Sequence, residues 1–296
     1  MEATNMTTAL EAVIEWLWQP LSYAFMQRGL AAAVLVGVVC AVVGTYVVLR
    51  GMAFFGDALA HTILPGVALG YLVNGGARDA LFWWALGTAI FSALGIGVIS
   101  KNARVKEDTA IGIIFAGMFA LGIALISTVR SYAIDLSHFL FGNVLGVSPH
   151  SLMIMAFFGG LVLVVIIALY KEFLTLAFDP VLAVTLRMPV SLLNNILLVL
   201  IAITVAVSMQ TVGVALMVAM LVTPAATAYL LTNRLPVMMV CAALIAAVCG
   251  VAGLYLSYYL SIASGAAIVL TATLLFFIAF LFAPQRGLVS ERFRRK

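Results

Sequence analysis

Charged side chains are scarce in this sequence. Only 9% of its 296 residues are Asp, Glu, Lys or Arg, whereas a soluble domain carries roughly 25%. Hydrophobic residues make up 65%, and the mean hydropathy is +1.23. Apolar runs long enough to cross a bilayer recur along the whole chain. This composition excludes an ordinary soluble protein and predicts an all-α membrane protein, a polytopic bundle of transmembrane helices.

The residues that enzymes and cofactors need are also few. The three cysteines, Cys40, Cys241 and Cys249, lie inside apolar runs, which is typical of small core residues rather than disulfides or metal clusters. There is no phosphate-binding GxxxxGK[ST] loop, no HExxH and no GxSxG with partners. His138 and His150 lie outside the apolar runs and form no ligand cluster by spacing. We therefore expect no enzyme, no nucleic-acid partner and no ATPase activity of the chain's own.

The apolar runs predict nine spans of the lipid bilayer. Their approximate ranges are 29–49, 52–73, 80–100, 109–128, 151–170, 191–209, 212–231, 236–258 and 265–284. The tail 285–296 holds five Lys and Arg residues and should stay in the cytoplasm. Counting back from it places 12 of the 15 Lys and Arg inside, which favours nine spans with an external segment 1–28. The short turn at Gln210 and Thr211 leaves eight spans open.

Two stretches between spans are too polar to cross the membrane. One is 131–150 on the outside, and the other is 171–190 on the inside. In the second, Asp179 is suited to cap a helix and Pro180 to begin it, and Pro189 should stop it about nine residues on. So short a helix should lie along the cytoplasmic surface. It could be an ordinary capped loop helix or a docking helix for a cytoplasmic partner.

The run 52–73 contains two ionisable side chains. Asp57 is the only acidic residue inside the nine apolar cores, and an ionised carboxylate there is costly unless a partner compensates it. His61 follows at i+4, so both side chains project from one helix face. Pro65 cannot donate to the His61 carbonyl, which should leave that oxygen free. The helix thus offers a carboxylate, an imidazole and a carbonyl, ligands that suit Mn²⁺, Zn²⁺ or Fe²⁺.

Three interpretations of this pair are open from the residues alone. Asp57 and His61 could be a neutral buried pair that holds two helices together, a proton relay, or part of a metal site. One Asp and one His are too few ligands for a metal, but a two-fold dimer would supply two of each. Gly66 and Gly70 form a small-xxx-small pattern that would let helix backbones pack closely.

The stretch VVLRGMAFFGDALAHTILPGVALGYL (47–72) closely resembles the second-helix signature of the ABC-type permeases for manganese, zinc and iron. Four further stretches match that family in order: KEDTAIGIIFAGMFALGI (106–123), DLSHFLFGNVLGVS (135–148), LAFDPVLAVTLRMPV (176–190) and SMQTVGVALMVAMLVTPAATAYLL (208–231). The final helix, SGAAIVLTATLLFFIAFLFAP (264–284), fits as well. Together they cover most of the chain, which is far more specific than any one stretch.

The resemblance implies an ABC importer permease fold, with one transmembrane domain (29–284) that works as a homodimer in the bacterial inner membrane. It also implies cytoplasmic ATP-binding subunits and an extracytoplasmic protein that delivers a divalent metal. The family's metal-selecting residues fall on Asp57 and His61, so the ion should pass between the two copies with no cofactor permanently bound. Uptake should weaken as the pH falls, because protonation of the imidazole competes with the metal.

The family's ATPase-contacting segment falls on the short helix at 179–190. Its residues here are Asp179, Pro180, Leu182, Ala183, Arg187 and Pro189. Many relatives have a glycine at Arg187, where it would close the helix in left-handed geometry. Arg187 should do so less readily, and Pro189 should still end the helix. Some relatives carry an acidic residue and a proline where this chain has Ser261 and Ala263. Because the acidic residue is missing here, we expect these positions to play no part in metal binding.

The identity of the metal rests on two of the matching stretches. The stretches 208–231 and 135–148 look most like the manganese-group members, which favours Mn²⁺ over Zn²⁺ and Fe²⁺. Zn²⁺ binds such ligands more tightly, so selection would have to come from geometry or from the delivery protein. Two other classes stay open. A proton-coupled secondary transporter would use Asp57 and His61 as a relay, and a structural membrane subunit would tolerate their substitution.

Overall fold

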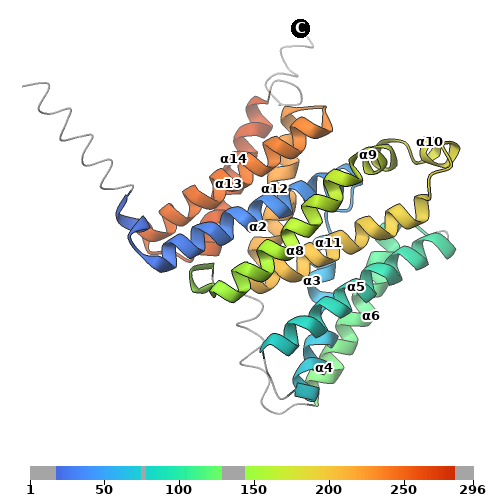
Figure 1. Cartoon of the computed structure of the whole chain (residues 1–296), viewed down its shortest axis with the longest axis horizontal. Helices are drawn as coiled ribbons and strands as arrows, with labels where there is room; N and C mark the ends of the chain where they lie inside the picture. Colours follow the sequence, from blue (N-terminus) through green and yellow to red (C-terminus); the bar gives the residue numbers. More distant parts are fainter. Residues whose placement is uncertain (1–17, 75–77, 104, 129–143, 284–296) are drawn as a thin grey trace, which may run out of the picture.

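The computed structural model of the chain describes residues 18–74, 78–103, 105–128 and 144–283 (Figure 1). Its elements are α2 (Ala24–Leu49), α3 (Phe55–Thr62), α4 (Leu64–Asn74), α5 (Arg78–Asn102), α6 (Glu107–Ser127), the 3₁₀ turn η1 (Val144–Gly146), α8 (Pro149–Ala168), α9 (Tyr170–Phe178), α10 (Pro180–Thr185), α11 (Val190–Val212), α12 (Val214–Leu231), α13 (Leu235–Leu260) and α14 (Ser264–Phe282). The basic tail 285–296, most of the stretch 131–150 and the start of the N-terminal segment lie outside the described residues.

Nine helical segments in the described ranges are long and apolar enough to cross a membrane, as the apolar runs predict. Eight are single helices, and the ninth, Phe55–Asn74, consists of α3 and α4. The sixth span continues through the expected turn at Gln210 and Thr211 to Val212. Gly213 makes the turn instead, with a φ of 87° that favours glycine.

Pro65 divides the second span. A proline has no N–H to donate, and its ring crowds the carbonyl four residues earlier, here that of His61. α3 accordingly ends at Thr62 and α4 begins at Leu64. The backbone N–H of Ile63 points to the His61 carbonyl. This i→i+2 contact does not have hydrogen-bond geometry, so whether the oxygen is free to bind a ligand stays a prediction.

The centre of the bundle is formed by α2, which packs against α8, α11, α12 and α13 (Figure 1). Every residue from 39 to 47 is buried. Gly44 allows the closest approach, because a Cβ there would overlap the Leu221 carbonyl of α12. Helices in lipid associate through this kind of close packing at small residues.

The connection between α8 and α11 contains the helix that the sequence predicts at 179–190. α9 and α10 project beyond the ends of α8 and α11 (Figure 1). The Asp179 carboxylate accepts a hydrogen bond from the Leu182 N–H at 2.9 Å, and Pro180 is the first helical residue. The predicted cap thus has the expected geometry.

The other end of α10 differs from the prediction. The helix has 6 residues and ends at Thr185. Arg187 adopts a left-handed φ of 56°. The N–H groups of Arg187 and Met188 donate to the carbonyls of Val184 (2.9 Å) and Ala183 (3.0 Å), which is the Schellman arrangement. Arg187 therefore closes the helix as a glycine would, and Pro189 precedes α11 instead of ending α10.

Basic residues are unevenly distributed between the two ends of the bundle. At the end that carries α10 the described chain has Arg50, Lys101, Lys106, Lys171, Arg187 and Arg234. The opposite end has Arg28 and the start of α5 at Arg78. The described residues thus keep the charge asymmetry that the whole sequence has.

Candidate metal-binding site

α3 brings together the two ionisable side chains of the second span. Asp57 lies in its first turn and His61 in its last. The distance between His61 Nε2 and Asp57 Oδ1 is 3.8 Å, longer than the roughly 2.7–3.2 Å of an N–H···O hydrogen bond. The i,i+4 spacing therefore places them side by side without a hydrogen bond between them.

This separation suits two ligands of one ion. Nitrogen and oxygen ligands lie about 2.1 Å from a divalent transition metal, so two of them are roughly 3–4 Å apart. The side chain of Asp57 is 37% exposed and that of His61 is 30% exposed. Both donors are thus accessible at the surface of one subunit, which does not fit a buried pair that holds two helices together.

Two phenylalanines of α6 pack against the imidazole. The ring centroids of Phe115 and Phe119 lie 6.0 and 5.6 Å from that of His61, both in edge-on geometry. The two phenylalanine rings stack on each other at 5.7 Å. His61 Nδ1 is buried and has no hydrogen-bond partner among the described residues. Aromatic packing is therefore what orients the imidazole in this part of the chain.

The same span packs against α12 and α5 through its glycines. A Cβ at Gly56 would overlap the side chain of Leu221 in α12. A Cβ at Gly66 would overlap the Trp84 carbonyl of α5, and one at Gly70 would lie 3.0 Å from the Trp84 ring. Gly66 and Gly70 thus serve close packing inside one subunit.

The site lies near an outer face of the subunit. α6, which packs against the imidazole through Phe115 and Phe119, also exposes large apolar side chains: Ile113, Leu121 and Ile123 are 55%, 48% and 50% exposed. Within the described ranges, no group of three or more His, Cys, Asp and Glu side chains could hold a metal ion. Two donors are fewer than the four or more that such ions take. The described chain therefore supplies only part of a coordination shell.

The residues predicted to contact an ATPase lie on and beside α10. Leu182 is 47% exposed and its apolar neighbours Val181 and Val184 are 76% and 64% exposed, whereas Ala183 is fully buried. Arg187 and Pro189 are exposed as well. α10 thus presents an apolar surface beyond the ends of the spans.

Ionisable side chains inside an apolar span mark candidate ion pathways through a membrane protein. The chain belongs to the ABC 3 transport family, whose sequence model matches residues 22–283. The family that the five stretches predict is therefore confirmed.

Individual relatives agree with this assignment. The manganese transport system membrane protein MntC of Halalkalibacterium halodurans is 47% identical over 278 residues, 94% of each chain. The probable iron transport system membrane protein of Haemophilus influenzae is 38% identical over 274 residues, 93% of this chain and 99% of that protein. A solved structure, PsaBC from Streptococcus pneumoniae in complex with Fab, matches with a TM-score of 0.80 and 38% identity, covering 95% of this chain and 99% of that one. The predicted permease fold is confirmed.

Proposed function

We propose that this chain is the membrane-spanning subunit of an ATP-driven importer for a divalent transition metal, and that the ion is Mn²⁺. The observation that supports this most is the pair Asp57 and His61, accessible, adjacent and not hydrogen-bonded to each other in an apolar span. A carboxylate and an imidazole held in this way match the ligand preference of such ions, and the ion compensates the cost of the charge.

Two copies of the chain complete the site in this proposal. One subunit offers two donors on α3, which packs against α6, and α6 exposes apolar side chains. A two-fold axis beside α3 and α6 would bring Asp57 and His61 of both copies around one ion.

ATP hydrolysis is carried by separate ATP-binding subunits. The basic residues concentrate at the α10 end, which the positive-inside rule assigns to the cytoplasm. The exposed apolar side chains of Val181, Leu182 and Val184 give those subunits a surface to press on. A metal-binding protein outside the cell would deliver the ion to the opposite end.

The connections between helices suggest how ATP binding would open the site in this proposal. The ion loses its waters and binds Asp57 and His61 of both copies. ATP binding then displaces α10, which is joined directly to α11, and α11 packs against α3. Movement of α11 would thus reach the helix that holds the ion, and the site would open to the cytoplasm.

The proton-coupled secondary transporter is not favoured, because the chain belongs to a family of ABC transporters. The two functions differ in a simple measurement. Uptake driven by ATP stops when the ATP-binding subunits are inactivated and continues with an uncoupler, whereas a proton-coupled carrier behaves in the opposite way.

The site itself is tested by Asp57→Ala and His61→Ala in the assembled transporter. Each variant should lose uptake of radiolabelled manganese, because half of a two-donor set is gone from each copy, and should still assemble with the ATP-binding subunits. Asp108→Ala is the control, since Asp108 is an exposed carboxylate at the start of α6. Normal uptake in either site variant would show that the ion binds elsewhere.

The choice of manganese is tested separately. Zn²⁺ binds nitrogen and oxygen ligands more tightly than Mn²⁺, so binding strength alone does not identify the transported ion. Stimulation of ATPase activity in the reconstituted complex should be greatest with Mn²⁺ when Mn²⁺, Zn²⁺ and Fe²⁺ are supplied one at a time. Greater stimulation by Zn²⁺ or Fe²⁺ would replace manganese as the assigned ion.

A further inference from the structure

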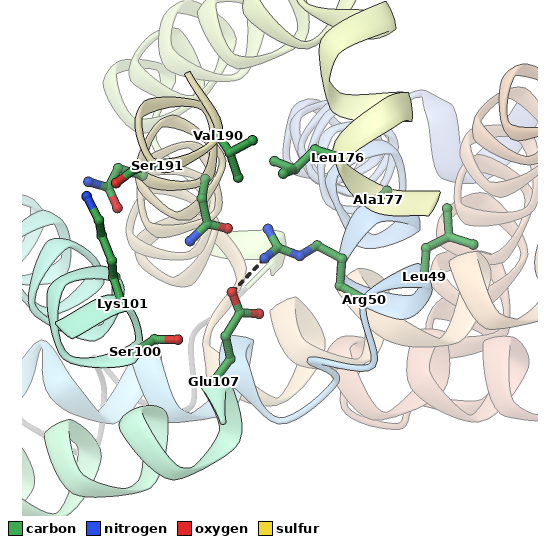
Figure 2. Close-up of a pocket in the computed structure, with 12 residues that line it drawn as sticks. Leu49, Arg50, Ser100, Lys101, Glu107, Leu176, Ala177, Val190 and Ser191 are labelled. Atoms are coloured by element: carbon green, nitrogen blue, oxygen red, sulfur yellow. Dashed lines mark hydrogen bonds and ion pairs between the residues drawn. The ribbon is translucent and has the colours of Figure 1, made fainter. Parts of the chain in front are cut away.

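A second polar site lies at the α10 end of the bundle, and neither Asp57 nor His61 lines it. It is a cavity of about 710 Å³, within the roughly 300–1,000 Å³ of small-molecule sites. The ends of α2, α5 and α6 form one side of it, and α9 and α11 form the other (Figure 2). The function proposed above makes no use of this cavity.

The charged residues that line the cavity have a net charge of +1. Arg50 Nη2 pairs with Glu107 Oε1 at 2.6 Å, and the two side chains are only 13% and 27% exposed. Lys101 lines the same cavity and has no ion-pair partner among the described residues. One carboxylate therefore faces two cations, which makes the cavity a poor passage for a divalent metal and a favourable place for an anion.

Two buried polar atoms of the lining residues have no partner in the described chain. They are Arg50 Nη1, a donor, and Asn194 Oδ1, an acceptor. Burial lowers the pKa of Arg50, and the nearby Glu107 offsets this only in part. Because Nη1 has no partner, the guanidinium lacks one hydrogen-bond acceptor. A ligand that fits here needs anionic oxygens for Arg50 and a hydroxyl or amine for Asn194.

We propose that the cavity binds the phosphate group of an anionic phospholipid with a hydroxylated headgroup. Phosphate oxygens would accept from Lys101 and, after a shift of the side chains that cover it, from Arg50 Nη1; a headgroup hydroxyl would donate to Asn194 Oδ1 after the same shift. Basic pockets between transmembrane helices on the cytoplasmic side are suited to such headgroups. Leu49, Leu176 and Val190 add an apolar wall for the lipid's glycerol and acyl part. A soluble phosphate ester shares the same chemistry without acyl chains.

The bound headgroup would touch both segments that flank α10. Leu176 and Ala177 come just before α10, and Val190 and Ser191 come just after it. The opposite wall is formed by Arg50, at the C-terminal end of α2, together with residues of α5 and α6. A lipid in this position would link the base of α10 to the central bundle. The proposal does not depend on which ion is transported.

The test is binding of a fluorescent phosphatidylglycerol to the purified transporter complex in detergent. Lys101→Gln should weaken binding about tenfold, as expected for loss of one charge-assisted hydrogen bond, and Lys101→Arg should restore it. Because Lys101 is exposed, its substitution should not disturb folding. Lys171→Gln on α9 is the control, since Lys171 is exposed at the same end and does not line the cavity.

Two further titrations distinguish the source of the phosphate. Phosphatidylcholine, which has no net charge, should bind no better to the unaltered complex than to the Lys101→Gln variant. If glycerol 3-phosphate binds in a Lys101-dependent way and phosphatidylglycerol does not, the lipid assignment is overturned in favour of a soluble ester. Phosphatidylglycerol binding that is equal in the unaltered complex and in Lys101→Gln overturns the anion site. Metal uptake is not measured in any arm, so failure here leaves the transport proposal untouched.

Discussion

His61 owes its position to two residues outside its own helix. The imidazole makes no hydrogen bond with Asp57, since the two nearest atoms are 3.8 Å apart. The rings of Phe115 and Phe119 lie against it instead. Metal affinity depends on ligands that are held in place before the ion arrives. The two phenylalanines are therefore positioning residues for the proposed site.

Phe119→Leu should weaken the apparent affinity for Mn²⁺ about tenfold, because loss of a supporting contact to a metal ligand typically costs 10–100-fold. The measurement is half-maximal stimulation of ATPase activity by Mn²⁺ in the reconstituted complex. Phe157→Leu on α8 is the matched control, because Phe157 is 68% exposed and lies outside the site. An unchanged Mn²⁺ dependence in Phe119→Leu would mean that the ring does not orient the ligand.

The sequence predicts the adjacency of Asp57 and His61 because four residues make one helical turn. It does not predict Phe115 and Phe119, which approach from another helix more than 50 positions away. Both lie in the matching stretch 106–123. Their i,i+4 spacing places them on one helix face, and this was the sequence feature that could have indicated a shared role. Pro65 shows the same limit: its missing N–H was predicted to affect the His61 carbonyl, whereas the division of the span into α3 and α4 was not predicted.

Among the elements, α10 shows which helix end can be predicted. Its start is set by two local rules, the capping carboxylate of Asp179 and a proline at the first helical position, and both hold. Its end depends on a left-handed residue, and Arg187 takes that conformation although it is not a glycine. The hydrogen bonds of Met188 and Arg187 to the last turn compensate the backbone cost, which local propensity does not reveal.

Arg187→Gly should stabilise this end of α10 by roughly 1 kcal/mol, because a side chain in left-handed backbone costs about that much. Hydrogen exchange of the Met188 amide should then slow about fivefold after correction for its intrinsic rate. Arg187→Ala removes the same charge but keeps a Cβ in the left-handed conformation, so it should not show this slowing. Equal protection in the two variants would mean that the arginine backbone carries no strain.

The whole bundle is predicted much better than the places where its helices meet. Apolar length alone gives nine spans, and the structure has nine candidates in its described ranges. The cavity proposed to bind an anion could not be predicted in the same way, because Arg50, Lys101 and Asn194 belong to segments far apart in the chain: the C-cap of α2, α5 and α11. Length and hydropathy fix which segments cross the membrane. Which side chains share a cavity depends on helix packing.

The proposed dimer leads to a prediction for the assembled molecule. In the proposed dimer each copy contributes two donors from its described residues, Asp57 and His61, so an ion would need both copies at once. Two copies joined in one polypeptide, with Asp57→Ala and His61→Ala in one of them, should therefore lose manganese uptake completely. If each subunit held its own site, the joined protein would keep about half of its activity. Uptake by the joined protein with two unaltered copies is the control, and assembly with the ATP-binding subunits shows that the joined variant is folded. Half-activity in the one-sided variant would rule out an ion shared across the axis while leaving the family assignment intact.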